Sequence, residues 1–152
     1  MCDYCGCHDF PLIRRFADEH LVIEETAGAL RRAIMSGDTA TAVPLRERLR
    51  GLLLPHTEAE ERGLFAELRD EGSLAGAVSA LCAEHADLHA ALASPDRTTV
   101  LPALDRLHRH IDNEEHGLFP AAVIALPIDA WDRITTADPA GTGRLVAGHS
   151  SV

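Results

Sequence analysis

The chain reads His56-Thr57-Glu58-Ala59-Glu60-Glu61-Arg62-Gly63-Leu64-Phe65 in its first half and His110-Ile111-Asp112-Asn113-Glu114-Glu115-His116-Gly117-Leu118-Phe119 in its second half. Both stretches follow the pattern His-x-x-x-Glu-Glu-x-Gly-Leu-Phe. Because four residues turn an α-helix through about 400°, the His and the first Glu of each stretch lie on the same face. Two such helices facing each other would bring two His and two Glu together, a donor set suited to a pair of iron or manganese ions.

The composition of the chain favours a single helical domain. It has 152 residues, of which 46% are hydrophobic, and a chain of this size buries roughly 70% of its unfolded surface. Ala and Leu are abundant whereas aromatic, Val and Ile residues are few, which favours packed helices over a sheet. Lys and Arg number 14 against 24 Asp and Glu, for a net charge of −10. We therefore expect no nucleic-acid partner.

Apolar positions spaced by alternating steps of three and four residues predict four amphipathic helices. These helices span about residues 11–36, 41–72, 73–94 and 98–121, with Ala121 on the inward face of the last. Pro55 lies inside the second helix and predicts a kink beside His56. Short polar connections predict an all-α, up-down-up-down four-helix bundle. A short fifth helix over residues 128–134 should cover one end of the core with Trp131.

This pattern divides the chain into three parts. Residues 1–9 form a Cys-rich arm, residues 10–137 form the bundle, and residues 138–152, rich in Gly, Ala, Ser and Thr, form a flexible tail. No apolar run has the length of a membrane span and no signal peptide is evident, so we expect a cytoplasmic protein with no membrane partner.

Helical phase separates the histidines of the predicted bundle into two groups, and two of the nine, His8 and His149, lie outside it. His108 and His116 are turned about 200° and 240° from His110 and should face solvent. Burying inward imidazoles and carboxylates without partners would cost a few kcal/mol apiece, more than the net stability of a domain. Bound metal supplies the missing partner. We predict that the inward side chains converge on metal, namely His20, His56, Glu60, His85, His89, His110 and Glu114.

Other glutamates near the two repeats lie off the shared face. Glu58, Glu61 and Glu115 are expected to be solvated. Glu24 follows His20 by four residues, and two interpretations stay open for it. It is either a ligand or hydrogen-bonding neighbour of the metal site, or a salt-bridged surface residue.

The number of donors favours two metal ions over one. Tetrahedral zinc takes four ligands, fewer than the five His and two Glu of the inward set. Two octahedral ions offer about twelve positions, and five imidazoles, two bridging carboxylates and a bridging oxide or hydroxide fill about eleven. About one position remains for a small ligand such as O₂, peroxide, nitric oxide or azide.

This series of spaced residues resembles one known family. The order His20, His56-x-x-x-Glu60, His85-x-x-x-His89, His110-x-x-x-Glu114 is similar to that of the hemerythrins and hemerythrin-like HHE cation-binding proteins, over roughly residues 9–125. The repeated Glu-Glu-x-Gly-Leu-Phe is similar to family sequences around the metal helices. The resemblance implies a four-helix bundle with an oxo- or hydroxo-bridged, non-haem di-iron centre, in which the five histidines bind iron and the two glutamates bridge.

The last carboxylate distinguishes two branches of this family. In the oxygen-carrying hemerythrins it is an Asp five residues after its His, whereas Glu114 follows His110 by four. The chain therefore looks like the bacterial HHE branch, whose members are tied to oxygen, nitric oxide or peroxide handling.

The Cys-rich arm lies outside this resemblance. Cys2, Cys5 and Cys7 are more suited to thiol or metal chemistry than to structural disulfides in a cytosolic protein. The sequence leaves open a second metal site, with zinc the expected ion, a redox switch, or a disordered thiol tail.

We therefore expect a non-haem di-iron protein that binds or detoxifies O₂, H₂O₂ or nitric oxide at the open iron position. If it is an enzyme, its activity would be catalase- or peroxidase-like or would consume nitric oxide. The alternative is a sensor of iron or redox state that signals through a partner without significant turnover. Ferritin-type storage ranks lower, because that architecture uses Glu-x-x-His pairs, which the inward histidines lack. The expected partner is the small ligand, and a homodimer is left open.

Overall fold

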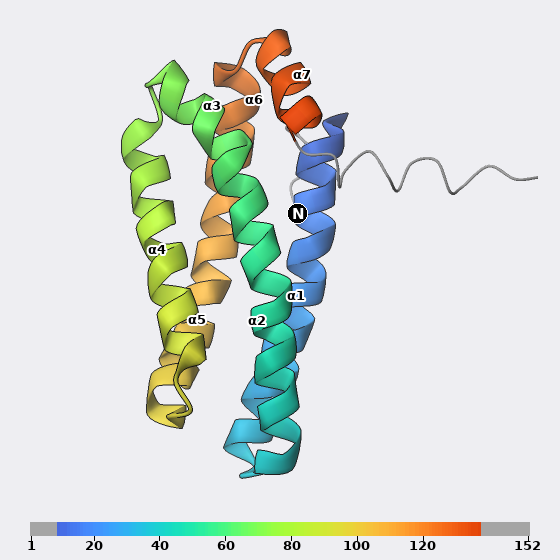
Figure 1. Ribbon diagram of the computed structural model, residues 1–152, viewed down its shortest axis with the longest axis vertical. Helices are drawn as coiled ribbons and strands as arrows, with labels where there is room; N and C mark the ends of the chain where they lie inside the picture. Colours follow the sequence, from blue (N-terminus) through green and yellow to red (C-terminus); the bar gives the residue numbers. More distant parts are fainter. Residues whose placement is uncertain (1–8, 138–152) are drawn as a thin grey trace, which may run out of the picture.

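The computed structural model describes residues 9–137, which form a helical bundle without strands. The elements are α1 (Pro11–Met35), α2 (Thr39–Arg62), α3 (Leu64–Glu71), α4 (Ala75–Ala93), α5 (Arg97–Asn113), the π-helical turn η2 (Glu114–Leu118), α6 (Phe119–Ala125) and α7 (Ile128–Ala137). The long helices α1, α2, α4 and α5 run alternately down and up, and α3, α6 and α7 lie together at one end (Figure 1). This arrangement confirms the predicted all-α bundle with a short last helix.

The described residues and the helix boundaries differ in part from the predicted division of the chain. The predicted arm, apart from Asp9, and the predicted tail lie outside the described residues. Helix α2 begins two residues earlier than expected, because the Asp38 side chain accepts a hydrogen bond from the Thr41 backbone N–H at 3.1 Å and caps the helix. Within residues 9–137, none of the helices is long and apolar enough to cross a membrane.

The two repeated stretches adopt different backbones. Helix α2 runs without a break through Pro55, and the predicted second helix is divided at Gly63 (φ −101°, ψ −95°), which separates α2 from α3. In the second copy the same position, Gly117, lies in the π-helical turn η2, and the chain continues into α6. A π-turn holds one extra residue and so shifts the helical phase beyond it. Ala122 is therefore buried in place of the predicted Ala121.

The two equivalent glycines should respond differently to alanine. A Cβ at Gly63 would lie 3.0 Å from the Ala59 carbonyl oxygen and 3.0 Å from Cγ2 of Ile134, whereas a Cβ at Gly117 meets nothing within 4 Å. We expect Gly63→Ala to lower the free energy of unfolding by about 1–3 kcal/mol through this clash. Gly117→Ala should raise it by up to about 1 kcal/mol through better helix propensity. Urea denaturation of both variants in the same metal state measures the contrast, and equal effects would contradict it.

Two apolar clusters fill the bundle above and below one polar layer. The cluster nearer α3, α6 and α7 contains Phe16, Phe65, Phe119 and Trp131, and the other contains Leu30, Leu49, Leu92 and Leu104. Trp131 is buried against Phe10, with ring centroids 4.5 Å apart, as expected for a side chain that covers the end of the core. The polar layer between the clusters is thereby shut off from water at both ends.

Candidate metal centre

The polar layer consists of six side chains from the four long helices and η2. Each is buried, with at most 4% of its surface exposed: His20, His56, Glu60, His85, His110 and Glu114. Polar side chains are otherwise scarce in this interior, and burying six of them requires partners.

Glu60 turns one carboxylate oxygen to each side of the layer. Its Oε1 atom lies 3.2 Å from Nε2 of His56 and 3.8 Å from Nε2 of His20. Its Oε2 atom lies 3.4 Å from Nε2 of His85, which belongs to the opposite pair of helices.

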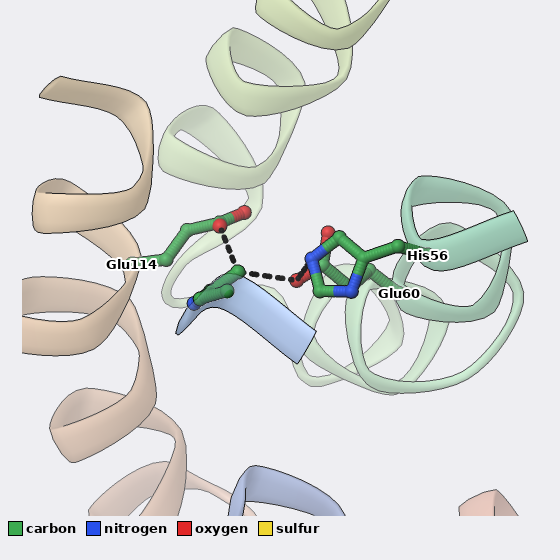
Figure 2. Close-up of side chains that lie close together, drawn as sticks. His56, Glu60 and Glu114 are labelled. Atoms are coloured by element: carbon green, nitrogen blue, oxygen red, sulfur yellow. Dashed lines mark ion pairs between the residues drawn. The ribbon is translucent and has the colours of Figure 1, made fainter. Parts of the chain in front are cut away.

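Glu114 repeats this arrangement from the other side. Its Oε1 atom lies 3.2 Å from Nε2 of His110 and 3.8 Å from Nε2 of His85, and its Oε2 atom lies 3.3 Å from Nε2 of His20. Figure 2 shows Glu114 reaching into the layer from one side, and Glu60 with His56 from the other. The six side chains thus surround two neighbouring positions. We call them the His20–His56 position and the His85–His110 position.

The donor atoms of this layer fit cations. Nε2 of His20 and all four carboxylate oxygens of Glu60 and Glu114 are buried and have no hydrogen-bond partner among residues 9–137. Nε2 of His85 faces Nε2 of His110 at 2.9 Å. When a neutral imidazole donates through Nδ1, its Nε2 carries a lone pair, and two such nitrogens at this distance need a proton or a metal ion to bind both of them. The residues present therefore suit a bound metal.

The pKa values of the buried side chains also indicate that the layer favours positive charge. Burial by itself would lower the pKa of His20, but nearby carboxylates, led by Glu114, raise it to about 11. Burial is likewise outweighed at His56, whose pKa Glu60 helps to raise to about 9. Burial would raise the pKa of Glu114, yet its histidine neighbours, led by His110, hold it well below the usual value. The layer keeps its carboxylates ionised and attracts positive charge.

A second set of four carboxylates, the outer glutamates, holds the outward ring nitrogen of each buried histidine. Each comes from the preceding long helix, so the contacts form a closed circuit from α1 to α2, α4, α5 with η2, and back to α1. The Nδ1–carboxylate contacts are His56 with Glu19 (2.7 Å), His85 with Glu61 (2.8 Å), His110 with Glu84 (2.7 Å) and His20 with Glu115 (3.0 Å). Such acceptors orient imidazoles so that Nε2 points at a metal.

The helical phase of these glutamates did not reveal the circuit. The prediction that Glu115 is solvated is wrong, because its side chain is only 17% exposed and contacts His20. Glu61 is partly exposed as expected but also contacts His85, and Glu58 is exposed. The roles of Glu19 and Glu84 were not predicted. The sequence does contain a feature that could have identified the four outer glutamates. Each outer glutamate is the direct neighbour in sequence of an inward residue, as in Glu19-His20 and Glu60-Glu61, and one residue turns a helix by about 100°, toward the adjacent helix.

Two other predicted site residues, His89 and Glu24, have partners outside the six-residue layer. His89 is half-buried, and its Nε2 lies 2.9 Å from the Thr57 hydroxyl. Glu24 pairs with the exposed His108 at 2.7 Å. The cysteines of the predicted second site, Cys2, Cys5 and Cys7, lie outside the described residues.

The Phe that ends each repeat stacks on one of the buried histidines of the layer. Phe65 stacks on His85 with ring centroids 5.7 Å apart and an interplanar angle of 8°, and Phe119 stacks on His20 at 5.9 Å and 2°. The repeated Leu-Phe therefore packs apolar surface directly against the buried imidazoles, which excludes water from them.

Fold and site together define a four-helix bundle with a buried His/Glu cluster that could hold metal. The model of the hemerythrin HHE cation-binding domain matches residues 11–122, and the chain belongs to this family. Searches of curated proteins and of solved structures found no match.

Proposed function

We propose that this protein holds two iron ions in the polar layer and binds or detoxifies a small oxidant, O₂, H₂O₂ or nitric oxide, at an open coordination position. The observation that carries the proposal is the division of the carboxylate oxygens. Glu60 and Glu114 each offer one oxygen to each of the two positions, and each position also has two imidazoles. Four protein donors per position leave room for further ligands in an octahedral geometry.

The residues of the chain have separate tasks in this proposal. The outer glutamates keep each Nδ1 as a donor, so that the four Nε2 lone pairs face inward. Phe65, Phe119 and the two apolar clusters keep bulk water out. Bound iron would supply a vacant coordination position and electrons for a small oxidant.

Packing favours a small ligand over an organic substrate. The six side chains of the layer are buried between the apolar clusters, so a large molecule would have to displace packed side chains to reach them. A groove of about 350 Å³ between α4 and α5 is lined by Glu84, Arg109 and His110 among others, and so reaches the outer side of one site histidine. A diatomic molecule or peroxide suits this approach.

A sensor is the second candidate function. The closed circuit of outer glutamates connects the layer to all four long helices, so a change at the site would act on each helix. A sensor would bind the ligand with negligible consumption of peroxide or nitric oxide, and ligand binding would change the protease sensitivity of the chain.

Metal content per chain, with the visible spectrum before and after anaerobic reduction, tests the proposal. We expect about two irons per chain and absorption that bleaches on reduction and returns in air. Peroxide and nitric oxide consumption then separates turnover from sensing. Zinc alone, or no metal after reconstitution with iron, would contradict the proposal.

A further inference from the structure

A pocket lies at the end of the bundle opposite α3, α6 and α7, between the turn that joins α1 to α2 and the connection from α4 to α5 (Figure 1). Its volume is about 180 Å³, and much of its wall is apolar, formed by Leu30, Ile34, Val43 and Val100 among others. Leu30 and Val100 also belong to the apolar cluster on that side of the polar layer. The cluster therefore separates this pocket from the metal centre.

Two arginines give the apolar pocket a positive charge. Arg46 of α2 and Arg97 of α5 line it, and none of the lining residues within 9–137 is acidic. The nearby carboxylates of Asp38 and Asp96 accept hydrogen bonds from backbone N–H groups and cap α2 and α5. The whole chain has 24 acidic residues against 14 basic ones, so a lining with arginines alone runs against its composition. Charge complementarity favours an anion here.

The guanidinium of Arg46 is held in place but only partly paired. Its Nη1 atom donates to the Ser94 carbonyl at 2.8 Å, which fixes the side chain between the two helix pairs. Its Nη2 atom lies 3.6 Å from a carboxylate oxygen of Glu47, which is 53% exposed, and such a contact contributes little. Its Nε atom is buried and has no hydrogen-bond partner within residues 9–137. The edge formed by Nε and Nη2 has the geometry that matches a carboxylate.

We propose that this pocket binds a small carboxylic acid as its anion, with the carboxylate at Arg46 and Arg97 and an apolar body against Leu30, Ile34 and Val43. A cavity of about 150 Å³ holds one benzene ring, so 180 Å³ limits the body to about six to eight carbon atoms. An inorganic anion would leave the apolar wall unfilled, and a neutral apolar molecule would leave the arginines unpaired. The inference does not depend on the proposed di-iron function.

Benzoate is the probe for the test, because it joins a carboxylate to one aromatic ring. Benzamide keeps the shape without the charge, and acetate keeps the charge without the ring. By isothermal titration calorimetry, we expect benzoate to bind at least about tenfold more tightly than either, the effect of a charge-assisted hydrogen bond or of a buried ring. Carboxylates can also bind iron, so visible absorption is recorded in the same titration and should not change. Equal affinity for the three probes would overturn the inference.

Two variants locate the binding. Arg46→Met removes the charge and should weaken benzoate binding at least about tenfold, and Ala42→Leu keeps the charge but fills the pocket and should weaken it similarly. Arg48→Met is the matched control, because Arg48 is exposed on the same helix outside the pocket lining, and it should match the wild type. Circular dichroism and metal content check the fold of each variant.

Three outcomes would overturn the inference and leave the proposed function standing. The first is unchanged benzoate affinity in a folded Arg46→Met or Ala42→Leu protein. The second is a change in visible absorption that follows benzoate binding, which would place the probe at the metal centre. The third is inorganic phosphate binding as tightly as benzoate and with the same dependence on Arg46, which would show a site for inorganic anions.

Discussion

Glu60→Ala is expected to remove both metal ions from the protein, because its two oxygens face different positions. Oε1 serves the His20–His56 side and Oε2 the His85 side. Removing the side chain deletes one of four protein donors at each position and leaves Glu114 as the single carboxylate among the six side chains of the layer. Metal content should fall from about two ions per chain to near zero, with loss of visible absorption.

The matched control for this variant is Glu58→Ala. Glu58 lies on the same helix, two residues earlier, and is exposed. It should retain full metal content and an unchanged spectrum. Circular dichroism of the two metal-free variants checks that both fold. A folded Glu60→Ala protein with two metal ions would refute the assignment of Glu60 as the shared ligand.

Glu84→Ala is expected to weaken metal binding about 10- to 100-fold without touching the layer itself. Glu84 accepts from Nδ1 of His110 at 2.7 Å, and without it the ring loses the contact that fixes its tautomer and orientation. Competition against a chelator of known affinity measures the loss. Glu84→Gln keeps an acceptor and should lie between the wild type and Glu84→Ala.

Glu24→Ala is the control for this second prediction. Glu24 contacts Nδ1 of His108 at the same distance, 2.7 Å, but outside the layer and with an exposed imidazole. Its loss should leave metal affinity unchanged, because an exposed pair contributes little. If Glu84→Ala and Glu24→Ala behaved alike, the outer glutamates would have no role in metal binding.

Periodicity was enough to predict the bundle and the inward side chains. Steps of three and four place a residue correctly around its own helix axis, which is why His20, His56, His85 and His110, with Glu60 and Glu114, are buried as expected. Their role as metal ligands stays a prediction. His89 shows the limit of phase: it shares a side of α4 with His85, yet contacts Thr57 on the neighbouring helix.

The features that periodicity missed depend on neighbouring helices. The phase of Glu61 or Glu84 on its own helix does not say which histidine stands opposite. The two repeats also have the same pattern around Gly63 and Gly117, yet one breaks its helix and the other winds into a π-turn. Only Gly63 packs closely, against Ile134 of α7. Tertiary contacts, absent from any local pattern, distinguish the two copies.

The circuit of outer glutamates has a consequence for how the bundle opens. Each long helix, with η2 counted as part of α5, gives one glutamate to the next and receives one on its own histidine. Detaching any one helix therefore breaks two of the four contacts. If the contacts did not close into a circuit, the first and the last helix would each be held by only one contact. We expect amide hydrogens near the layer in α1, α2, α4 and α5 to exchange with deuterium in one concerted event, and those of α7 to exchange separately. No helix of the circuit is held by fewer contacts than the others, so none is a preferred starting point for unfolding.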